Sequence, residues 1–430
     1  MRRAESKTMA TKKNGRRKSK SKFFARVAAV VITIILLLII AALVLYFFFP
    51  DTFEKIYSGV MQTIERGDTS GDGDTSGDGD TSGGNTSVTE GQLEDITSSG
   101  LSIHFIRFEN DKAGDCTLIK CGDTEVLIDA GSTQSSAKTI KKYIDRYCTD
   151  GTLEYVIATH ADQDHIAALV GTSSGGKYNG VLYSYDIGTV IRFDRTNKDE
   201  VTEAGNSTLY GKFLDALDYV GDNGTSVYTA SQCWYQTDGA AKTYYLDEEN
   251  TISMNILYNY YYEHSSSDEN NYSVCMLLTQ EIATDDYRNY LFTGDLEEEG
   301  EEYLVENNEL PEVELFKAGH HGSPTSSNDC LLSVIKPKYV VVCCCAGTDE
   351  YTDTPANQFP SQAFIDRVSK YTDCVYVTNM VSDNADGYEP MNGDIVFYID
   401  ENQLKLWCSN NTTKLKDTEW FKANRTGWTD

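Results

Sequence analysis

The strongest chemical signal in the chain is the segment Thr-His-Ala-Asp-Gln-Asp-His at residues 159–165. Four side chains that commonly bind metals stand within six residues: His160, Asp162, Asp164 and His165. An apolar stretch expected to be a strand precedes them, and Ile-Ala-Ala-Leu, expected to be helical, follows. Imidazole and carboxylate groups at such a turn suit two divalent cations a few ångströms apart. The alternative is a polar turn that holds these residues by chance.

Two other segments offer the further ligands that a two-cation site needs. Asp295 follows Tyr-Leu-Phe-Thr-Gly, and the glycine lets the chain turn so that the carboxylate projects from a strand end, where it could bridge both cations. The pair His320 and His321 follows the apolar stretch 313–317 in the same manner. Four of the six histidines of the chain fall in these segments, which weighs against ordinary core histidines.

Together these motifs resemble those of the metallo-β-lactamase superfamily. The opening of the region agrees, with Gly-Asp-Cys at 114–116 and Val-Leu-Ile-Asp-Ala-Gly at 126–131. The closest likeness, over residues 101–407, is to the extracellular hydrolase domain of ComEC-type competence proteins. The resemblance implies a four-layer αββα sandwich with the cations at the rim between two sheets. It also implies the ligands, for which we assign His160, Asp162, Asp164, His165, Asp295 and, of the histidine pair, His320.

Three positions depart from the family pattern. Asp162 stands where many members have histidine, no histidine lies near Asn271, and Phe359-Pro360 stands where competence-type domains have His-Pro. We expect two divalent cations, with Zn²⁺ as the first choice. Mn²⁺ is the alternative, because a carboxylate in place of an imidazole makes the first site a harder donor set. A weak or empty first site is the other possibility.

Such a centre predicts hydrolysis, because a bound cation lowers the pKa of its water toward neutrality. We expect Asp164 to help hold the attacking water, His321 to donate a proton to the leaving group and Ser323 to hydrogen-bond a substrate oxygen. Asp129, at a strand end, is expected to accept a hydrogen bond from His160 or His165. Lys317 is either a contact for a substrate anion or an ordinary strand residue.

The elements that must position these side chains lie in one α/β domain, predicted at 99–430. Expected strands are 103–108, 117–120, 125–129, 155–159, 252–258, 273–278, 290–293, 313–317, 339–344, 374–378 and 394–399. Expected helices lie near 134–147, 207–220, 297–307, 326–335 and 361–370. The run of cysteines at 343–345 reads as small buried strand residues rather than metal ligands or disulfide partners, because consecutive strand residues face opposite sides.

The chain before this domain predicts a membrane anchor. Residues 27–49 are 23 residues that are apolar apart from Thr33 and Tyr46, long enough to cross a bilayer core. Residues 1–26 hold 11 Lys or Arg and one acidic residue, so this basic tail is expected in the cytoplasm. Residues 50–66 fit a short amphipathic helix, and 67–98, which opens on Gly-Asp-Thr-Ser-Gly repeats, fits a flexible linker. We therefore expect a single-pass protein of the cell membrane with an extracellular hydrolase domain.

The net charge of −29 argues against a broad basic face that grips nucleic acid, since the chain beyond residue 26 holds 26 basic and 65 acidic residues. The predicted function is a membrane-tethered extracellular phosphodiesterase or nuclease, with extracellular DNA as the expected substrate. One alternative is hydrolysis of another envelope polymer, such as a teichoic-acid-type phosphodiester or an amide. A catalytically silent binding module on the same fold is the second alternative. The oligomeric state is not predicted.

Overall fold

The computed structural model describes residues 88–428. The predicted basic tail (1–26), membrane anchor (27–49), amphipathic helix (50–66) and repeats (67–84) lie outside the described residues. Within residues 88–428, no helix combines the length and the apolar character needed to cross a bilayer.

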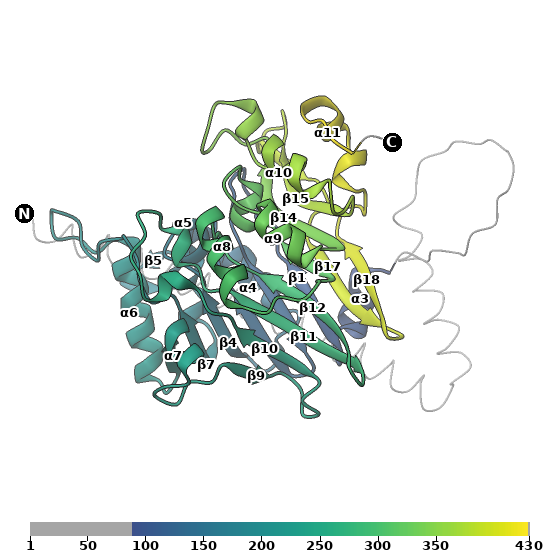
Figure 1. The fold of residues 1–430 in the computed structure, drawn as a ribbon. Helices are drawn as coiled ribbons and strands as arrows, with labels where there is room; N and C mark the ends of the chain where they lie inside the picture. Colours follow the sequence, from purple (N-terminus) through teal and green to yellow (C-terminus); the bar gives the residue numbers. More distant parts are fainter. Residues whose placement is uncertain (1–87, 429–430) are drawn as a thin grey trace, which may run out of the picture. The chain divides into compact units, whose positions relative to one another are not determined.

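Two eight-stranded mixed sheets form the centre of the described body (Figure 1). The first sheet has the order β18-β17-β1-β2-β3-β4-β7-β8 and the second β16-β15-β14-β13-β12-β11-β10-β9. The strands of the first are β1 (Leu101–Phe105), β2 (Thr117–Cys121), β3 (Thr124–Ile128), β4 (Thr152–Ala158), β7 (Asp186–Arg192), β8 (Ser226–Thr229), β17 (Ile395–Asp400) and β18 (Gln403–Cys408). Those of the second are β9 (Thr243–Tyr245), β10 (Ile252–Ile256), β11 (Met276–Ala283), β12 (Asp286–Phe292), β13 (Leu315–Lys317), β14 (Tyr339–Ala346), β15 (Val375–Val381) and β16 (Tyr388–Pro390). A small separate hairpin joins β5 (Ser173–Ser174) to β6 (Lys177–Tyr178).

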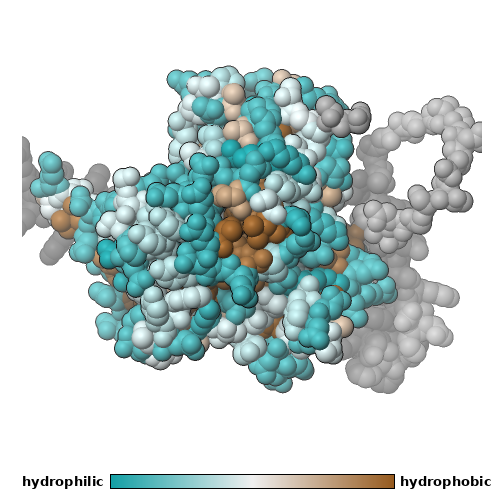
Figure 2. Space-filling view, viewed as in Figure 1, coloured by the Kyte–Doolittle hydropathy of each residue, from teal (hydrophilic) through white to brown (hydrophobic). Residues whose placement is uncertain are grey.

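Helices flank the sheets. The α-helices are α3 (Glu90–Ile96), α4 (Ala137–Ile144), α5 (Gln163–Val170), α6 (Leu209–Asp222), α7 (Ala230–Tyr235), α8 (Glu298–Asn307), α9 (Asp329–Ile335), α10 (Gln362–Val368) and α11 (Glu419–Asn424). Short 3-10 helices are η1 (Gln134–Ser136), η2 (Val181–Tyr183), η3 (Tyr260–Tyr262), η4 (Asn270–Tyr272), η5 (Gly319–Gly322), η6 (Pro355–Asn357) and η7 (Leu415–Asp417). The face shown in Figure 2 is largely hydrophilic, with one apolar area near its centre, as suits an acidic body with an internal core.

The apolar side chains of the described body sort into two main cores. Along β12, Tyr290 and Phe292 join the core that spans both sheets and the helices α4 to α6, whereas Leu291 faces the core beneath α8 to α10. Along β14, Cys343 and Cys344 divide in the same way. All eleven cysteines are free, and those at 343–345 are buried, which confirms their prediction as strand residues. The alternation follows from the two-residue period of a strand.

The strand directions bring the expected ligand segments to one rim. In the first sheet β3, β4 and β7 are parallel, and in the second β12, β13 and β14 are parallel. The carboxyl ends of parallel strands share one sheet edge, where ligands commonly bind in α/β folds. The turns that follow β4, β12 and β13 therefore emerge at the edges where the two sheets meet.

The helix α3 differs from the predicted linker, which was expected to extend to residue 98. The side chains of Thr89 and Gln92 form a reciprocal capping box at its start. Leu93 is fully buried beside Val396 and Tyr398, and the indole of Trp407 donates a 2.8 Å hydrogen bond to the carbonyl of Val88. The folded body thus begins before residue 90, because one buried leucine and a cap suffice to fix this short helix.

Candidate metal centre

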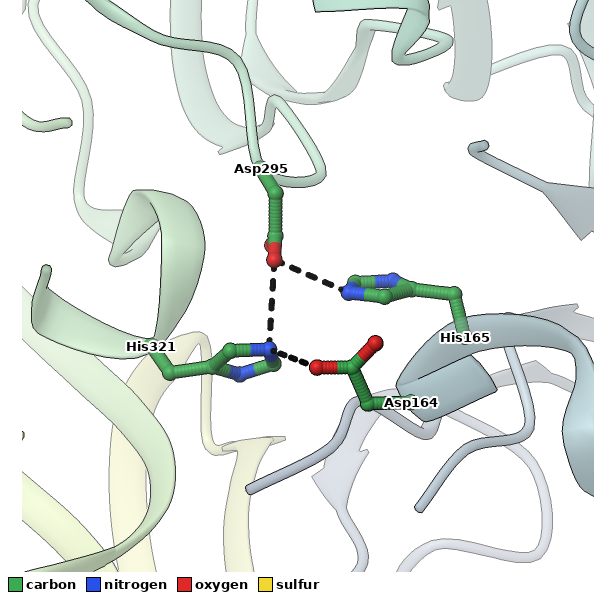
Figure 3. A group of neighbouring side chains, drawn as sticks. All are labelled: Asp164, His165, Asp295 and His321. Carbon is green, nitrogen blue, oxygen red and sulfur yellow. Dashed lines mark hydrogen bonds and ion pairs between the residues drawn. The ribbon is translucent and has the colours of Figure 1, made fainter. Parts of the chain in front are cut away.

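Four side chains from three distant segments meet at this rim (Figure 3). Asp164 and His165 lie in the first turn of α5, Asp295 follows β12, and His321 lies in η5 after β13. Oδ2 of Asp295 lies 3.0 Å from Nε2 of His165 and 3.1 Å from Nε2 of His321, which lies 3.3 Å from Oδ2 of Asp164. One ligand atom of each residue lies within 4.8 Å of all the others. We call these residues the four-ligand group.

Two glycines allow the backbone to deliver these side chains. Gly294 has φ +54°, and a Cβ there would lie 2.7 Å from Oγ of Ser273, the same oxygen that accepts a hydrogen bond from the Asp295 amide. At Gly131 a Cβ would lie 1.5 Å from the carbonyl oxygen of Asp164. Only glycine fits either position, so the chain after β3 can press directly against the first turn of α5.

The outer nitrogen of each imidazole is held by an acceptor. Nδ1 of His165 lies 2.7 Å from Oδ2 of Asp129, and Nδ1 of His321 lies 2.9 Å from the carbonyl oxygen of Cys343. A proton on Nδ1 leaves the lone pair of Nε2 directed into the group, as is usual for metal-binding histidines. The expectation that Asp129 supports a histidine is confirmed for His165. Asp129 also accepts from the amide and hydroxyl of Thr159, which fixes its carboxylate.

The chemistry of these donors fits a divalent cation. Nε2 of His321 is buried and faces only the carboxylates of Asp164 and Asp295, and Nε2 of neighbouring His160 is buried without a hydrogen-bond partner among the described residues. Bonds of about 2.0–2.1 Å from a tetrahedral cation to its ligands would place those ligands about 3.3 Å apart, close to the observed separations. Two imidazoles and two carboxylates form a borderline-to-hard donor set that accepts Zn²⁺ or Mn²⁺.

The same side chains form a tightly coupled charge network. Burial alone would raise the pKa of Asp295, but the charges of His165, His321 and Lys317 outweigh it and hold that pKa well below its usual range. Conversely, burial would lower the pKa of His165, and Asp295 and Asp129 instead raise it well above its usual value. A cation that binds the four-ligand group must therefore displace protons from the imidazoles.

The other expected ligands, His160 and Asp162, lie beside the group without completing a second one. The rings of His160 and His165 have centroids 4.1 Å apart, and Nε2 of His160 lies 3.6 Å from Oδ2 of Asp162. Among residues 88–428, no cluster of three or more potential ligands includes either residue. The carboxylate of Asp162 instead forms an ion pair with Lys198. The structure thus completes one of the two expected cation sites.

The assignment within the histidine pair requires a correction. His320 and His321 both have positive φ, 44° and 53°, and their rings diverge at an interplanar angle of 68°. His321 enters the four-ligand group, whereas Nδ1 of His320 lies 3.3 Å from both Oε1 of Glu297 and Oγ1 of Thr325. The structure therefore favours His321 as the ligand and leaves it unsuited to the expected role of proton donor. The sequence could not separate the two, because the left-handed backbone decides which ring faces inward.

Two further expectations also change. Oγ of Ser323 pairs with Oγ1 of Thr325 at 2.9 Å and is buried in its own turn, so no contact supports its expected role toward substrate. Lys317 takes part in the charge network of the site, which the interpretation as an ordinary strand residue does not include. Its buried ammonium pairs with Asp115 and lies 3.1 Å from Oδ1 of Asp295.

Three residues of the site had no predicted role. Asp115 is buried between Lys317 and His321, with its Oδ1 3.2 Å from Nδ1 of His321. Tyr351 and Lys198 reach Asp164 and Asp162 from remote loops. The Gly-Asp-Cys motif could have indicated Asp115, whereas nothing in the local sequence marks the other two. Phe359 is buried with its ring centroid 6.1 Å from that of His321, so an apolar wall stands where the competence-type pattern has histidine.

Comparisons with known proteins give one family match and several distant structural likenesses. The family model described as the metallo-beta-lactamase superfamily matches residues 110–195, which include the turn at 159–165. No curated protein matches the chain. Similar solved structures include the metallo-beta-lactamase fold protein YhfI from Bacillus subtilis, with 10% identity and a TM-score of 0.37 over 70% of this chain and 99% of that one. A variant of the CmlA beta-hydroxylase has 11% identity and a TM-score of 0.31, over 57% of this chain and 46% of that one. BJP-1, a subclass B3 metallo-beta-lactamase of Bradyrhizobium japonicum, has 12% identity and a TM-score of 0.26, over 46% and 64%.

These likenesses are distant and concern neither substrate nor mechanism. The described chain has a mixed α/β, metallo-β-lactamase-like fold, and its residues 110–195 match the metallo-beta-lactamase superfamily, whose members are typically metal-dependent hydrolases.

Proposed function

We propose that this chain is a membrane-anchored, metal-dependent hydrolase that cleaves phosphodiester bonds outside the cell. The observation that carries the proposal is the four-ligand group, in which two imidazole nitrogens and two carboxylates converge, one ligand atom of each lying within 4.8 Å of all the others. A divalent cation held there would polarise a phosphoryl oxygen and make water acidic enough to attack at neutral pH.

The residues of the group divide the remaining tasks. The side chain of Asp164 is 16% exposed, whereas those of His165, Asp295 and His321 are at most 2% exposed. Substrate and water must therefore arrive on the Asp164 side. Within residues 88–428, no hydrogen bond reaches Oδ1 of Asp164, so this oxygen is open to accept a proton from the attacking water. Lys317 and Asp129 hold Asp295 and His165 in place from behind.

The choice of a phosphodiester rests on the likeness of the sequence motifs to competence-type hydrolase domains. The acidic composition opposes tight binding of a polyanion, but a cation and Lys198 supply local positive charge at the rim. A teichoic-acid-type phosphodiester satisfies the same chemistry as DNA. An activity assay on both substrates is therefore needed to distinguish them.

The test uses the full-length protein, purified in detergent and loaded with Zn²⁺ or Mn²⁺. We expect cleavage of bis(p-nitrophenyl) phosphate, and we expect plasmid DNA to be cleaved in preference to teichoic-acid fragments. Asp164→Ala should lower the rate about 10³-fold, whereas Asp366→Ala, the same change at an exposed position of α10, should not. If the folded wild type takes up no cation and cleaves none of these substrates, the proposed hydrolase function is wrong. The remaining hypothesis would be a catalytically silent binding module on the same fold.

The membrane location is proposed from the apolar run at 27–49 and its basic flank. Protease added to intact cells should cleave the chain in the Gly-Asp-Thr-Ser repeats at 67–84 and release the hydrolase domain. A chain that resists protease until the cells are lysed would contradict an extracellular domain.

A further inference from the structure

Among residues 88–428, the half-site formed by His160 and Asp162 gathers no third ligand for a second cation. It offers one imidazole nitrogen and one carboxylate, 3.6 Å apart. Asn271, near which the family places a further histidine, turns away, since its Oδ1 accepts from the Glu297 amide and its amide group donates to Ser266. Two ligands are too few for a structural or catalytic cation, which usually takes at least three protein ligands.

A lysine occupies this half-site instead. The ammonium of Lys198 forms an ion pair with Oδ1 of Asp162. An ammonium has three N–H donors, of which the pair with Asp162 uses one. The Lys198 side chain is 42% exposed, which leaves the other donors accessible.

The position of Lys198 is fixed by a buried carboxylate. Glu269, 7% exposed, accepts hydrogen bonds from the hydroxyl of Thr196 at 2.7 Å and the amide of Asn197 at 2.6 Å. The same Glu269 accepts from the amide of Ala161 at 3.3 Å, between His160 and Asp162. One side chain thus ties the loop that carries Lys198 to the turn that carries the half-site. An ordinary surface ion pair has no such support.

A groove of about 540 Å³ opens beside this pair. Its lining includes Asp162, Gln163, Lys198, Thr202 and Tyr210. Lys198 is the only cationic side chain among the lining residues, which also include the carboxylates of Asp162 and Asp199, so the lining offers one positive charge and would repel a dianion more than a monoanion.

We propose that Lys198 takes the place of a second cation: the chain binds one divalent cation, at the four-ligand group, and Lys198 binds an anionic oxygen of the substrate at the half-site. The substrate class that this arrangement favours is a phosphodiester, with one negative charge, over a phosphomonoester, with nearly two. The part of the proposal that concerns binding of an anionic substrate rests on the proposed function. The part that concerns the number of bound cations depends only on the ligands described.

Cation content tests the first half. Full-length protein in detergent is dialysed to equilibrium against Zn²⁺ and analysed for metal by mass spectrometry, with circular dichroism to confirm folding. We expect one equivalent in the wild type, one in Asp162→Asn and none in Asp295→Asn. Two equivalents in the wild type that fall to one in Asp162→Asn would overturn the proposal.

Binding of dimethyl phosphate, a simple phosphodiester, tests the second half without requiring turnover. Calorimetry on the zinc-loaded protein should show an affinity at least about tenfold weaker in Lys198→Met, because a hydrogen bond from a charged donor is lost. Lys198→Arg should retain most of the affinity, and Lys370→Met, the same change in an exposed ion pair with Asp329, should retain all of it. Equal affinity in wild type and Lys198→Met would overturn this half. A wild type that binds one cation and dimethyl phosphate but cleaves no phosphodiester would refute the proposed function and leave this inference standing.

Discussion

The hydroxyl of Tyr351 donates a 2.6 Å hydrogen bond to Oδ2 of Asp164, although 187 residues separate the two in sequence. The ring of Tyr351 packs against that of Phe359, with centroids 5.2 Å apart. Burial and the charge of Asp164 raise the pKa of the phenol, so it remains a donor at neutral pH. The loop after β14 therefore closes over the most exposed member of the four-ligand group and orients its carboxylate.

Replacing Tyr351 by phenylalanine should weaken hydrolysis without removing the cation. The carboxylate of Asp164 would lose a charge-assisted hydrogen bond and its orientation, so we expect kcat/KM to fall about tenfold, mainly through kcat. Metal content by mass spectrometry should stay at the wild-type value. Tyr287→Phe, at an exposed tyrosine of β12, is the matched control. Identical rates in both variants would show that Tyr351 does not position Asp164.

Asp129→Asn should weaken cation binding, because Nδ1 of His165 would lose its carboxylate acceptor. Loss of such an outer partner typically lowers metal affinity about 10- to 100-fold. Competition with a chromophoric chelator would measure the change. Asp247→Asn, an equal change at a half-buried aspartate that accepts from Thr251, should leave the affinity intact. An unchanged affinity in Asp129→Asn would mean that Thr159 alone can hold the site.

The elements that carry a strong local pattern could be predicted from the sequence, and those stabilised by distant neighbours could not. The run Tyr-Val-Val-Val-Cys predicts β14 because all residues of this central strand after Tyr339 are buried. The strand β7, Asp-Ile-Gly-Thr-Val-Ile-Arg, was missed because its glycine and polar residues hide the pattern, and it forms through parallel pairing with β4 and β8. The helix α3 was missed because the linker composition continues into it.

The candidate site shows the same division. Asp164, His165 and Asp295 could be predicted because each ligand stands in a motif directly after a strand. The choice of His321 over His320 depends on two consecutive left-handed residues, which no local pattern specifies. Lys198 and Tyr351 reach the site through loop conformations fixed by Glu269 and Phe359, contacts between residues that are far apart in sequence.

The contribution of His104 to the stability of the folded body should fall as the pH decreases from 7 to 5. This imidazole is fully buried between the hydroxyls of Tyr143 and Ser102. Burial, with the charges of Lys120 and Arg146, lowers its pKa to about 3, whereas the unfolded chain has a pKa of about 6.5. Between these values the unfolded state binds the additional proton, so unfolding is favoured as the pH falls through 6.5, at a cost of about 2 kcal/mol by pH 5.

Thermal and denaturant unfolding of the chelator-treated protein at pH 7, 6 and 5 would measure this dependence. His104→Gln lacks the titrating group, so its change in unfolding free energy from pH 7 to pH 5 should be about 2 kcal/mol more favourable than that of the wild type, even if it is less stable at pH 7. His264→Gln, at an exposed histidine that stacks on Tyr260, should keep the wild-type slope. Equal slopes in wild type and His104→Gln would contradict the neutral buried imidazole.

Removing the ammonium of Lys317 should make folding depend on a bound cation. Lys317 is buried between Asp115 and Asp295, and Lys317→Met would leave both carboxylates without their shared partner. Breaking a buried pair on one side typically costs about 3–5 kcal/mol. We expect the metal-free variant to unfold at a markedly lower temperature than Lys370→Met, and added Zn²⁺ to raise its Tm more than that of the wild type, because a cation offsets the charge of Asp295.

Adding Asp115→Asn to Lys317→Met should recover part of the metal-free stability, since it removes one uncompensated charge. If the double variant were less stable than Lys317→Met, charge compensation would not be the role of Lys317.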